Sequence, residues 1–339
     1  MANTIFINKF KISQKNNRVF VIAEAGVSHF GSLKKAKKLI DLAKDSGADA
    51  VKFQAYVTEE LIHSGFKKWF YRMKKKEVNF SFFEKIKKFA DGKKITFLLT
   101  PHSETGIQWI KKLNLPAVKV GSGEIGNFEF LKKIIKLNRT IIISTGMHKL
   151  EELDKLKTFF EKMKFKKVVF LRCNTQYPTP EKDINLKSFD KFKEIFKNYF
   201  VGYSDHTNDD LAILGSIALG AKVIEKHISL DFNVKDAQDW KVSFDKFQLN
   251  NMVQKIRKFE IILGESNLKI SKNEKKSRIW ASRSIYSKKK LSKGKIITIS
   301  DVNFLRPGNN LSCSEFYKIN KRKLKKTILP NSPINLNDF

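Results

Sequence analysis

Short apolar runs alternate with longer amphipathic, lysine-coated segments across most of the chain. Runs rich in β-branched residues predict strands, and apolar positions three and four residues apart predict helices between them. The predicted strands are Val19–Gly26, Ala50–Tyr56, Ile95–Pro101, Ala117–Gly123, Thr140–Gly146, Lys167–Thr175, Phe200–Thr207 and Lys222–Ser229. The predicted helices include Leu33–Ser46, Phe80–Asp91, Glu104–Leu113, Phe128–Leu137, Leu150–Met163, Asp209–Leu219 and a long one near Phe244–Leu263. This alternation is typical of β–α units that form a parallel sheet.

Eight predicted strands in about 230 residues fit a (β/α)8 TIM barrel, whose usual length is about 250 residues. The alternative is an open, doubly wound sheet, because closure of the strands is not visible in a sequence. The barrel is favoured because nearly every strand begins with apolar residues and ends in polar ones, which in a barrel meet at one mouth. These polar residues are Glu24, Lys52, Gln54, Thr100, Lys119, Ser122, Ser144, Asn174, Thr175, Ser204, His206, Glu225 and His227.

A polar, lysine-rich stretch over residues 265–277 separates this region from a different kind of sequence. The remaining residues have short predicted strands, Gly and Pro turns and no long helix. Among them Gly294 and Asn331 each stand seven residues before an aspartate. Because Gly and Asn tolerate positive φ, this spacing predicts the same turn twice in a small β-rich domain. We therefore expect a barrel at 1–264, a linker at 265–277 and a second domain at 278–339.

Basic residues dominate the composition: 67 Lys and Arg against 34 Asp and Glu give a formal net charge of +33. The lysines are spread from end to end, whereas a nucleic-acid surface should be clustered and richer in arginine. We therefore expect an anionic small-molecule substrate and no nucleic acid, with a basic nucleic-acid-binding protein as the less favoured alternative. No apolar run reaches the roughly 18 residues of a membrane span, and the amino terminus lacks a signal-peptide core. The sequence predicts a cytoplasmic protein without membrane contact.

Two histidines and two lysines are the strongest candidates for chemistry. His206 and His227 end consecutive strands, which lie about 4.8 Å apart in a sheet, so the two imidazoles could share one divalent cation. The alternative is that each imidazole hydrogen-bonds a neighbouring carboxylate. Lys52 and Lys119 lie inside apolar strands, where a buried ammonium needs an anion or serves as a Schiff-base amine. The strand-end hydroxyls complete a predicted cradle for phosphate and carboxylate, and they belong to Thr100, Ser122, Ser144 and Ser204.

Eight short motifs occur in an order that matches a known family. They are Ala23–Gly26 (AEAG), Asp49–Gln54 (DAVKFQ), Lys119–Glu124 (KVGSGE), Ser144–Met147 (STGM), Cys173–Pro180 (CNTQYPTP), Gly202–Thr207 (GYSDHT), Gly220–His227 (GAKVIEKH) and Arg306–Asn309 (RPGN). Their order and spacing resemble the bacterial sialic acid synthases, which make N-acetylneuraminic, legionaminic or pseudaminic acid. The resemblance covers nearly the whole chain.

The resemblance implies a TIM barrel followed by an antifreeze-like (SAF) domain, paired as a domain-swapped homodimer. It implies a transferase that condenses phosphoenolpyruvate with an N-acetylmannosamine-like 2-acylamino hexose. The products would be a nine-carbon 2-keto sugar acid and phosphate, released by C–O cleavage. The alternative is another phosphoenolpyruvate-dependent synthase of a 2-keto sugar acid.

The resemblance also implies roles for individual residues. Phosphoenolpyruvate would be held by Lys52, Lys119, Ser122, Ser144, Ser204 and Thr100. A divalent metal, Mn²⁺ with Mg²⁺ or Co²⁺ as alternatives, would be bound by His206 and His227. The acylamino hexose would face Glu24, Gln54, Tyr177 and Asp239, and its N-acyl group would meet Arg306 of the partner chain. Asn174 and Thr175 are further substrate-binding candidates, and the catalytic set would be Glu24, Lys52, Lys119, His206 and His227.

Several positions depart from the family's usual motifs, and the loop Asp236–Asp239 lacks the usual Gly-Pro-Asp. Ser28 and Phe30 stand where the first loop usually has asparagines, and His102 stands where the motif Thr-Pro-Phe is usual. Such positions shape the sugar pocket more than the phosphoenolpyruvate site. The sequence therefore predicts the type of reaction and leaves the acceptor sugar open.

Overall fold

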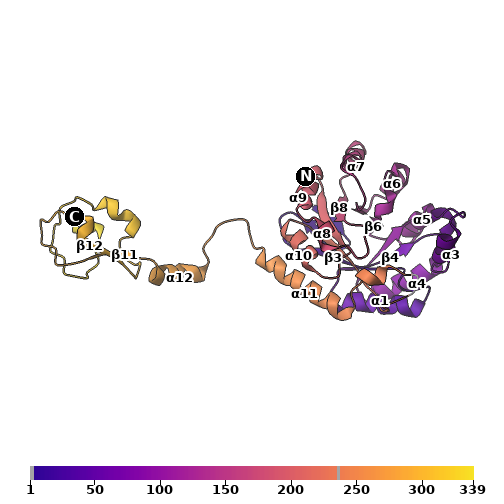
Figure 1. Cartoon of the computed structure of the whole chain (residues 1–339), viewed down its shortest axis with the longest axis horizontal. Coiled ribbons are helices and arrows are strands. Elements are labelled where there is room, and N and C mark those ends of the chain that lie inside the picture. The colour runs from indigo at the N-terminus through magenta and orange to yellow at the C-terminus, as the bar shows by residue number, and fades with distance from the viewer. Residues whose placement is uncertain (1–3, 235–236) are drawn as a thin grey trace. The chain divides into compact units, whose positions relative to one another are not determined.

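The computed structural model describes residues 4–234 and 237–339 (Figure 1). It divides the chain into two compact units, residues 1–264 and 265–339. No helix within the described residues is long and apolar enough to cross a membrane.

The first unit contains a closed barrel of eight parallel strands, joined in the order β10-β3-β4-β5-β6-β7-β8-β9. The strands are β3 (Phe20–Gly26), β4 (Ala50–Ala55), β5 (Thr96–Pro101), β6 (Ala117–Val120), β7 (Thr140–Ser144), β8 (Val168–Cys173), β9 (Phe200–Asp205) and β10 (Val223–His227). Each begins within a few residues of the position that the sequence predicts. The TIM barrel is therefore confirmed, and the open sheet is wrong.

The helices follow the strands along the chain and lie around the outside of the barrel (Figure 1). They are α1 (Leu33–Asp45), α2 (Thr58–Leu61), α3 (Lys67–Lys74), α4 (Phe80–Gly92), α5 (Glu104–Lys112), α6 (Phe128–Ile135), α7 (Leu150–Lys162), α8 (Glu181–Ile184), α9 (Ser188–Ile195), α10 (Leu211–Ala218) and α11 (Lys246–Ile262). Several helices begin at a residue whose side chain caps the first turn. At the start of α1 the Ser32 hydroxyl accepts a hydrogen bond from the amide of Lys35, and at the start of α5 the Ser103 hydroxyl accepts one from the amide of Gly106.

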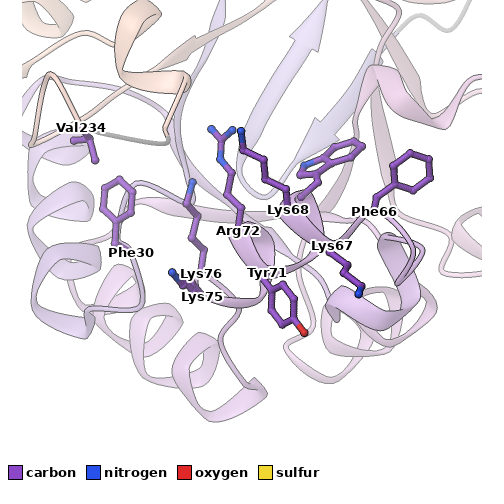
Figure 2. A pocket seen from close by; sticks show the side chains of 10 residues that line it. Phe30, Phe66, Lys67, Lys68, Tyr71, Arg72, Lys75, Lys76 and Val234 are labelled. Atoms are coloured by element: carbon purple, nitrogen blue, oxygen red, sulfur yellow. The ribbon is translucent and has the colours of Figure 1, made fainter.

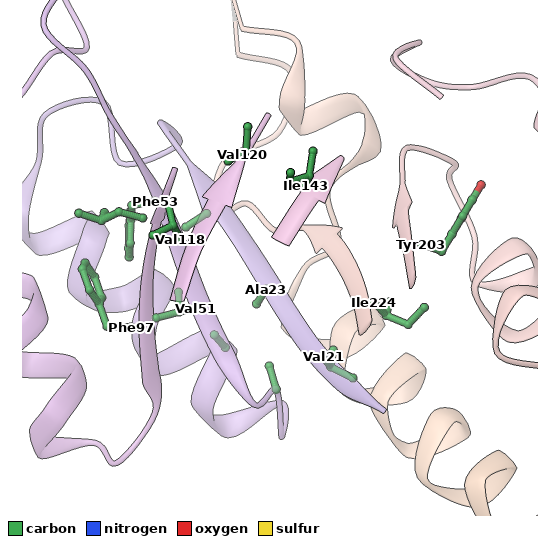
Figure 3. Close-up of a cluster of buried hydrophobic side chains, with 14 of the residues drawn as sticks. Val21, Ala23, Val51, Phe53, Phe97, Val118, Val120, Ile143, Tyr203 and Ile224 are labelled. Carbon is green, nitrogen blue, oxygen red and sulfur yellow. The ribbon is translucent and has the colours of Figure 1, made fainter. Parts of the chain in front are cut away.

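Alternate residues of each strand face opposite sides of the barrel wall. Val21 and Ala23 of β3, with Val51 and Phe53 of β4, belong to the outer core against the helices (Figure 3). The residues between them belong to a separate inner core, formed at the beginnings of the strands by Phe20, Ile22, Ala50, Leu98, Ala117, Ile142, Val169, Leu171, Phe200 and Val223. The barrel interior is therefore filled with apolar side chains near the amino ends of the strands, and the part near their carboxyl ends is left for polar groups.

An amino-terminal hairpin, which the sequence analysis does not predict, packs against the inner core. It consists of β1 (Thr4–Ile7) and β2 (Phe10–Ser13), and its Ile5, Ile7 and Ile12 side chains are buried there. The backbone carbonyl of Phe6 accepts a hydrogen bond from the hydroxyl of Thr140 at the start of β7. The hairpin thus covers the end of the barrel opposite the polar strand ends.

The second unit begins with α12 (Lys272–Ala281) and has an antiparallel pair, β11 (Ser284–Ser287) and β12 (Val302–Leu305). Its own core includes Ile285, Leu291, Ile297, Ile319 and Ile334. α12 forms where the sequence predicts part of a linker, because Ser271 and Glu274 make a reciprocal capping box at its start.

The repeated turn of the second unit is confirmed. Gly294 has φ of 88° and Asn331 has φ of 56°. Each turn is followed by a capping box that ends at the expected aspartate, Asp301 in one case and Asp338 in the other. The description of this unit as an SAF domain stays a prediction.

Candidate active site

Most barrel strands place polar side chains at their carboxyl ends, on the face that looks into the barrel. Side chains two residues apart on a strand share a face, so Glu24 follows the inner-core Ile22 and Lys52 follows the inner-core Ala50. The strand register sets these side chains at one level, because Glu24 is paired with Lys52 on one side and with His227 on the other. The predicted meeting of strand ends is therefore present.

Lys52 lies at the centre of one half of this cluster and is almost fully buried. Its Nζ atom is 2.6 Å from Oε2 of Glu24 and donates a hydrogen bond to the Thr100 hydroxyl at 2.7 Å. The same Nζ lies 3.7 Å from Oε2 of Glu225. One ammonium thus joins side chains from four strands, β3, β4, β5 and β10.

Lys119 has the same arrangement on the other side of Glu225. Its Nζ atom donates hydrogen bonds to the Ser144 hydroxyl at 2.7 Å and to the carbonyl of Val120 at 3.1 Å. It lies 3.5 Å from Oε1 of Glu225, which also accepts a hydrogen bond from the Ser204 hydroxyl at 3.0 Å. Glu225 is therefore the shared counter-ion of both lysines.

Burial and neighbouring charges shift the pKa values of the two carboxylates in this network in opposite directions. Burial raises the pKa of Glu24, although Lys52 acts against the rise. Burial also acts to raise the pKa of Glu225, but Lys119 and Lys52 outweigh it and hold that pKa below its usual range. Burial lowers the pKa of Lys119, while Glu225 acts against the fall. Glu225 is thus the ionised partner, and Glu24 is the carboxylate that holds a proton more readily.

Two imidazoles face each other at the ends of β9 and β10. The ring centroids of His206 and His227 are 5.3 Å apart, and the Tyr177 ring lies 4.1 Å from the first and 5.8 Å from the second. The His206 Nδ1 atom donates to the backbone carbonyl of Asn174 at 2.5 Å, which leaves its Nε2 atom free to bind. Burial and the neighbouring cations, His206 first among them, keep the pKa of His227 well below its usual value.

Three predicted sugar-facing side chains converge on Gly26, which ends β3 with φ of 53°. A Cβ atom at this position would lie 3.4 Å from Oε1 of Glu24, 3.5 Å from Oδ2 of Asp239 and 3.5 Å from Nε2 of Gln54. Gln54 also donates a hydrogen bond to Glu24 at 3.2 Å. The glycine therefore supplies both the backbone conformation and the space that bring these groups together.

A second glycine brings two more predicted residues together. The amide of Gly146 donates to the Ser122 hydroxyl at 2.9 Å, and a Cβ atom at Gly146 would overlap the hydroxyl of Thr175. Ser122 and Thr175 thus both lie against Gly146, in the loop that follows Ser144.

The Asn174 side chain does not join this cluster. The Asn174 amide donates to the carbonyl of Asp183 at 2.7 Å and accepts from Arg172 at 2.9 Å, so only the Asn174 backbone carbonyl contacts the histidine pair. Arg306 follows β12 in the second unit, where it is exposed.

Comparison with known proteins assigns this arrangement to a family. A profile of the NeuB family matches residues 39–268. The chain belongs to the NeuB family. It is 37% identical over 314 residues to the N,N'-diacetyllegionaminic acid synthase of Campylobacter jejuni, and the match covers 88% of this chain and 93% of that protein. It is 33% identical over 337 residues to a pseudaminic acid synthase of Campylobacter jejuni, with 96% of this chain and 97% of that protein covered.

Solved structures agree with this assignment. The N-acetylneuraminic acid synthetase of Leptospira borgpetersenii superposes with a TM-score of 0.75 at 31% identity, over 81% of this chain and 94% of that one. A truncated 3-deoxy-D-arabino-heptulosonate 7-phosphate synthase of Thermotoga maritima, at 15% identity and a TM-score of 0.60, shares the fold alone. The resemblance to sialic acid synthases is confirmed, and this NeuB-family chain is an enzyme of the nonulosonate synthase type.

NeuB-family synthases generally depend on a metal ion, and the histidine pair fits such an ion as two ligands. The neutral His227 ring is a nitrogen donor that divalent metals accept. Burial acts to lower the pKa of His206, but Cys173 and the Asn174 carbonyl raise it to about 9, so this ring would give up its Nε2 proton when it binds a metal. No group of three or more His, Cys, Asp or Glu side chains suited to a metal occurs within residues 4–234 and 237–339. Two imidazole ligands suit an ion that keeps coordination positions for water or substrate.

Sequence reasoning gave no role to two members of this NeuB-family site. Glu225 appears among the strand-end residues, but its place between both lysines was missed. Its position two residues before His227, on the same face of β10, is the signal that could have placed it. Cys173 was missed as well, and its Sγ atom lies 3.7 Å from Nδ1 of His206.

Proposed function

We propose that this enzyme condenses phosphoenolpyruvate with an open-chain 2-acylamino hexose of the N-acetylmannosamine type. The observation that carries the proposal is the pair of buried lysines, Lys52 and Lys119, joined through Glu225 at the mouth of the barrel. A small anion with both a carboxylate and a phosphate matches two ammonium groups that are surrounded by hydroxyls. Three of the hydroxyls already contact this network, those of Thr100, Ser144 and Ser204.

The reaction joins C3 of phosphoenolpyruvate to the aldehyde carbon of the hexose. The aldehyde oxygen takes up a proton, water adds to C2, and phosphate leaves as its C–O bond breaks. Glu24 is suited to give that proton, since burial raises the pKa of its carboxyl and it lies beside Gln54 at the sugar-facing side. Lys52 and Lys119 stabilise the negative charge of the phosphorylated intermediate, and neither needs to form a Schiff base.

His206 and His227 would hold the divalent metal, for which Mn²⁺ is our first choice and Mg²⁺ or Co²⁺ the alternatives. When bound, such an ion polarises the aldehyde oxygen as a Lewis acid. The hydrogen bond from His206 to the Asn174 carbonyl holds that ring in one tautomer and orientation. Tyr177 lies against both rings and limits the directions from which the hexose approaches them.

Arg306 belongs in this proposal to the site of a second copy of the chain, in a domain-swapped homodimer. It lies in the RPGN motif of a separately folded unit and is exposed there, as a residue that serves another chain's site would be. The proposal assigns it to the N-acyl group of the hexose, beside Gln54 and Asp239.

Phosphate release from phosphoenolpyruvate tests the function directly, with Mn²⁺ and a panel of 2-acylamino hexoses. With phosphoenolpyruvate labelled by ¹⁸O in its bridging oxygen, C–O cleavage places the label in the phosphate. Release with non-acylated sugars alone would favour another 2-keto sugar acid synthase. Release with none of the sugars would refute both, and borohydride trapping of a pyruvyl adduct would refute the lysine roles.

A further inference from the structure

The strand-end cluster is bounded differently on its two sides. On the hexose side, a pocket of about 900 Å³ over α3 is lined by cationic and aromatic side chains, among them Arg72 (Figure 2). Arg72 also lines a smaller pocket that reaches Gln54 and Asp239, so this side belongs to the acceptor and to the second copy in the proposed function. Behind His206 and His227, in contrast, the barrel wall holds a buried ion pair to which that function gives no role.

This ion pair joins Lys226 of β10 to Asp205 of β9, two residues that lie directly opposite each other in the strand register. The Lys226 Nζ atom is 2.6 Å from Oδ2 of Asp205, and both side chains are fully buried. Alternation along the strands places them on the outer face of the wall, where Tyr203 and Ile224 belong to the outer core (Figure 3). The histidine that follows each of them therefore lies on the inner face.

The ion pair also binds the backbone beside His206. The Asp205 carboxylate accepts hydrogen bonds from the Thr207 amide at 3.1 Å and from the Thr207 hydroxyl at 2.9 Å. The Lys226 ammonium donates to the Thr207 carbonyl at 2.6 Å. Because Asp205 precedes His206 and Thr207 follows it, the chain is held on either side of this imidazole.

Lys226 is connected to the second imidazole as well. Its Nζ atom lies 4.2 Å from the centre of the Phe244 ring, which is a cation–π contact. The Phe244 amide donates a hydrogen bond to the carbonyl of His227 at 2.9 Å. One buried ammonium therefore contacts residues that fix the backbone at both histidines.

We propose that Asp205 and Lys226 are positioning residues, which hold the imidazoles of His206 and His227 at the separation and orientation that one divalent ion requires. The inference rests on the proposed function, which assigns such an ion to these rings. Stability alone explains the pair poorly, because apolar side chains of similar volume often stabilise a protein as well as a buried ion pair does. Metal affinity, in contrast, typically falls by about 10–100-fold when a group that orients a ligand is removed.

Two double variants of the full chain separate positioning from stability. Asp205→Asn with Lys226→Met, the pair variant, removes both charges together, so neither is left buried and unpaired. The control is Asp49→Asn with Arg257→Met, which removes a 2.6 Å ion pair at the other end of the barrel. The match is close, because Asp49 also accepts a hydrogen bond from a backbone amide, that of Val21. Thermal melts show how much stability each variant loses.

The first readout needs neither metal nor turnover. In the full chain labelled with ¹⁵N-histidine, NMR follows exchange with water of the Nδ1 proton that His206 donates to the Asn174 carbonyl. The His206→Ala variant assigns this signal. We expect exchange at least about tenfold faster in the pair variant, because the ring leaves its position more often, and unchanged exchange in the control.

The second readout is Mn²⁺ binding without substrates, measured from the electron paramagnetic resonance signal of the free ion. The dissociation constant should rise by at least about tenfold in the pair variant and stay unchanged in the control. Thr207→Val is a milder variant, which removes the hydroxyl that donates to Asp205. It should accelerate exchange of the His206 proton by about threefold or more.

The outcomes are distinct. Unchanged exchange in the pair variant, or equal acceleration in the pair variant and the control, would overturn the proposal. Should the pair variant fail to fold, unchanged exchange in Thr207→Val would overturn it as well. Unchanged Mn²⁺ affinity in a folded pair variant would also count against positioning. An unaltered enzyme that binds no Mn²⁺ would refute the metal assignment of the proposed function, and proton exchange alone would then decide whether the pair positions the rings.

Discussion

Replacing Glu225 with glutamine tests whether one carboxylate holds the two buried lysines. The Glu225→Gln side chain keeps its shape and removes the negative charge that lies 3.7 Å from Lys52 and 3.5 Å from Lys119. At an effective dielectric constant of 20, each charge pair at this distance is worth about 4–5 kcal/mol before desolvation is counted. Loss of one partner from a buried ion pair typically destabilises a protein by about 3–5 kcal/mol.

Part of that loss is recovered because Lys119 can give up its proton, as burial already lowers its pKa. We therefore expect the free energy of unfolding to fall by about 3 kcal/mol, near the lower end of that range. For a unit of this size the fall corresponds to a melting temperature lower by about 6–12 °C. Scanning calorimetry of the barrel transition measures it, with Glu124→Gln outside the network as the matched control.

The ligand dependence of the same variant is the sharper measurement. Phosphoenolpyruvate supplies negative charge to the two lysines, so it should raise the melting temperature of Glu225→Gln by more than that of the unaltered enzyme. Turnover should nevertheless fall by at least about 100-fold, since the lysines are no longer held in their positions. An unchanged melting temperature together with an unchanged response to phosphoenolpyruvate would refute the counter-ion role.

Three further predictions concern other parts of the molecule. His206→Ala should abolish metal-dependent phosphate release while circular dichroism stays unchanged; full activity across a Mn²⁺ titration would contradict the metal assignment. Gly26→Ala should raise the KM for the hexose much more than that for phosphoenolpyruvate and destabilise the barrel by about 1–2 kcal/mol, because a side chain is strained at this positive φ. In the second unit, burial of Asp301 acts to raise its pKa, but hydrogen bonds from Lys295 and Thr298 lower it on balance. Its contribution to stability is therefore present above the unfolded pKa and lost as pH falls through the folded one. Asp301→Asn should flatten that acid dependence in thermal melts, and an unaltered profile would exclude this role.

The strands and their polar ends could be predicted from the sequence because both depend on residues that are close together along the chain. A parallel strand is buried on both faces, so it appears as an apolar run, and its period of two puts Lys52 and Gln54 on one side. Closure of the barrel depends on pairing between β10 and β3, which are far apart in the sequence. Periodicity alone leaves that closure open; the polar strand ends favoured it, and the resemblance to a family implied it as well.

The features that sequence reasoning missed are those that depend on partners distant in the chain. Helix α3 has eight residues and buries none of them, so no apolar period marks it, and the pocket beside it arises only where Phe30 faces it from another loop. The role of Glu225 was missed for a related reason. A carboxylate at a strand end indicates a polar mouth, but the distances to Lys52 and Lys119 on other strands decide that it is their counter-ion.

The position of the two lysines explains why the net charge of +33 gives little information about the site. Within the strand-end cluster, Lys52 and Lys119 share the ionised carboxylate of Glu225, while Glu24 holds a proton more readily, so the cluster carries only a small excess of positive charge. Its preference for an anion comes instead from burial, which makes each unpaired charge expensive and each well-placed partner strongly favoured. Surface lysines, in contrast, act through solvent and are screened within about 10 Å at moderate salt. Selection of the substrate therefore depends on a few buried groups, whereas the many exposed ones affect how fast anions arrive.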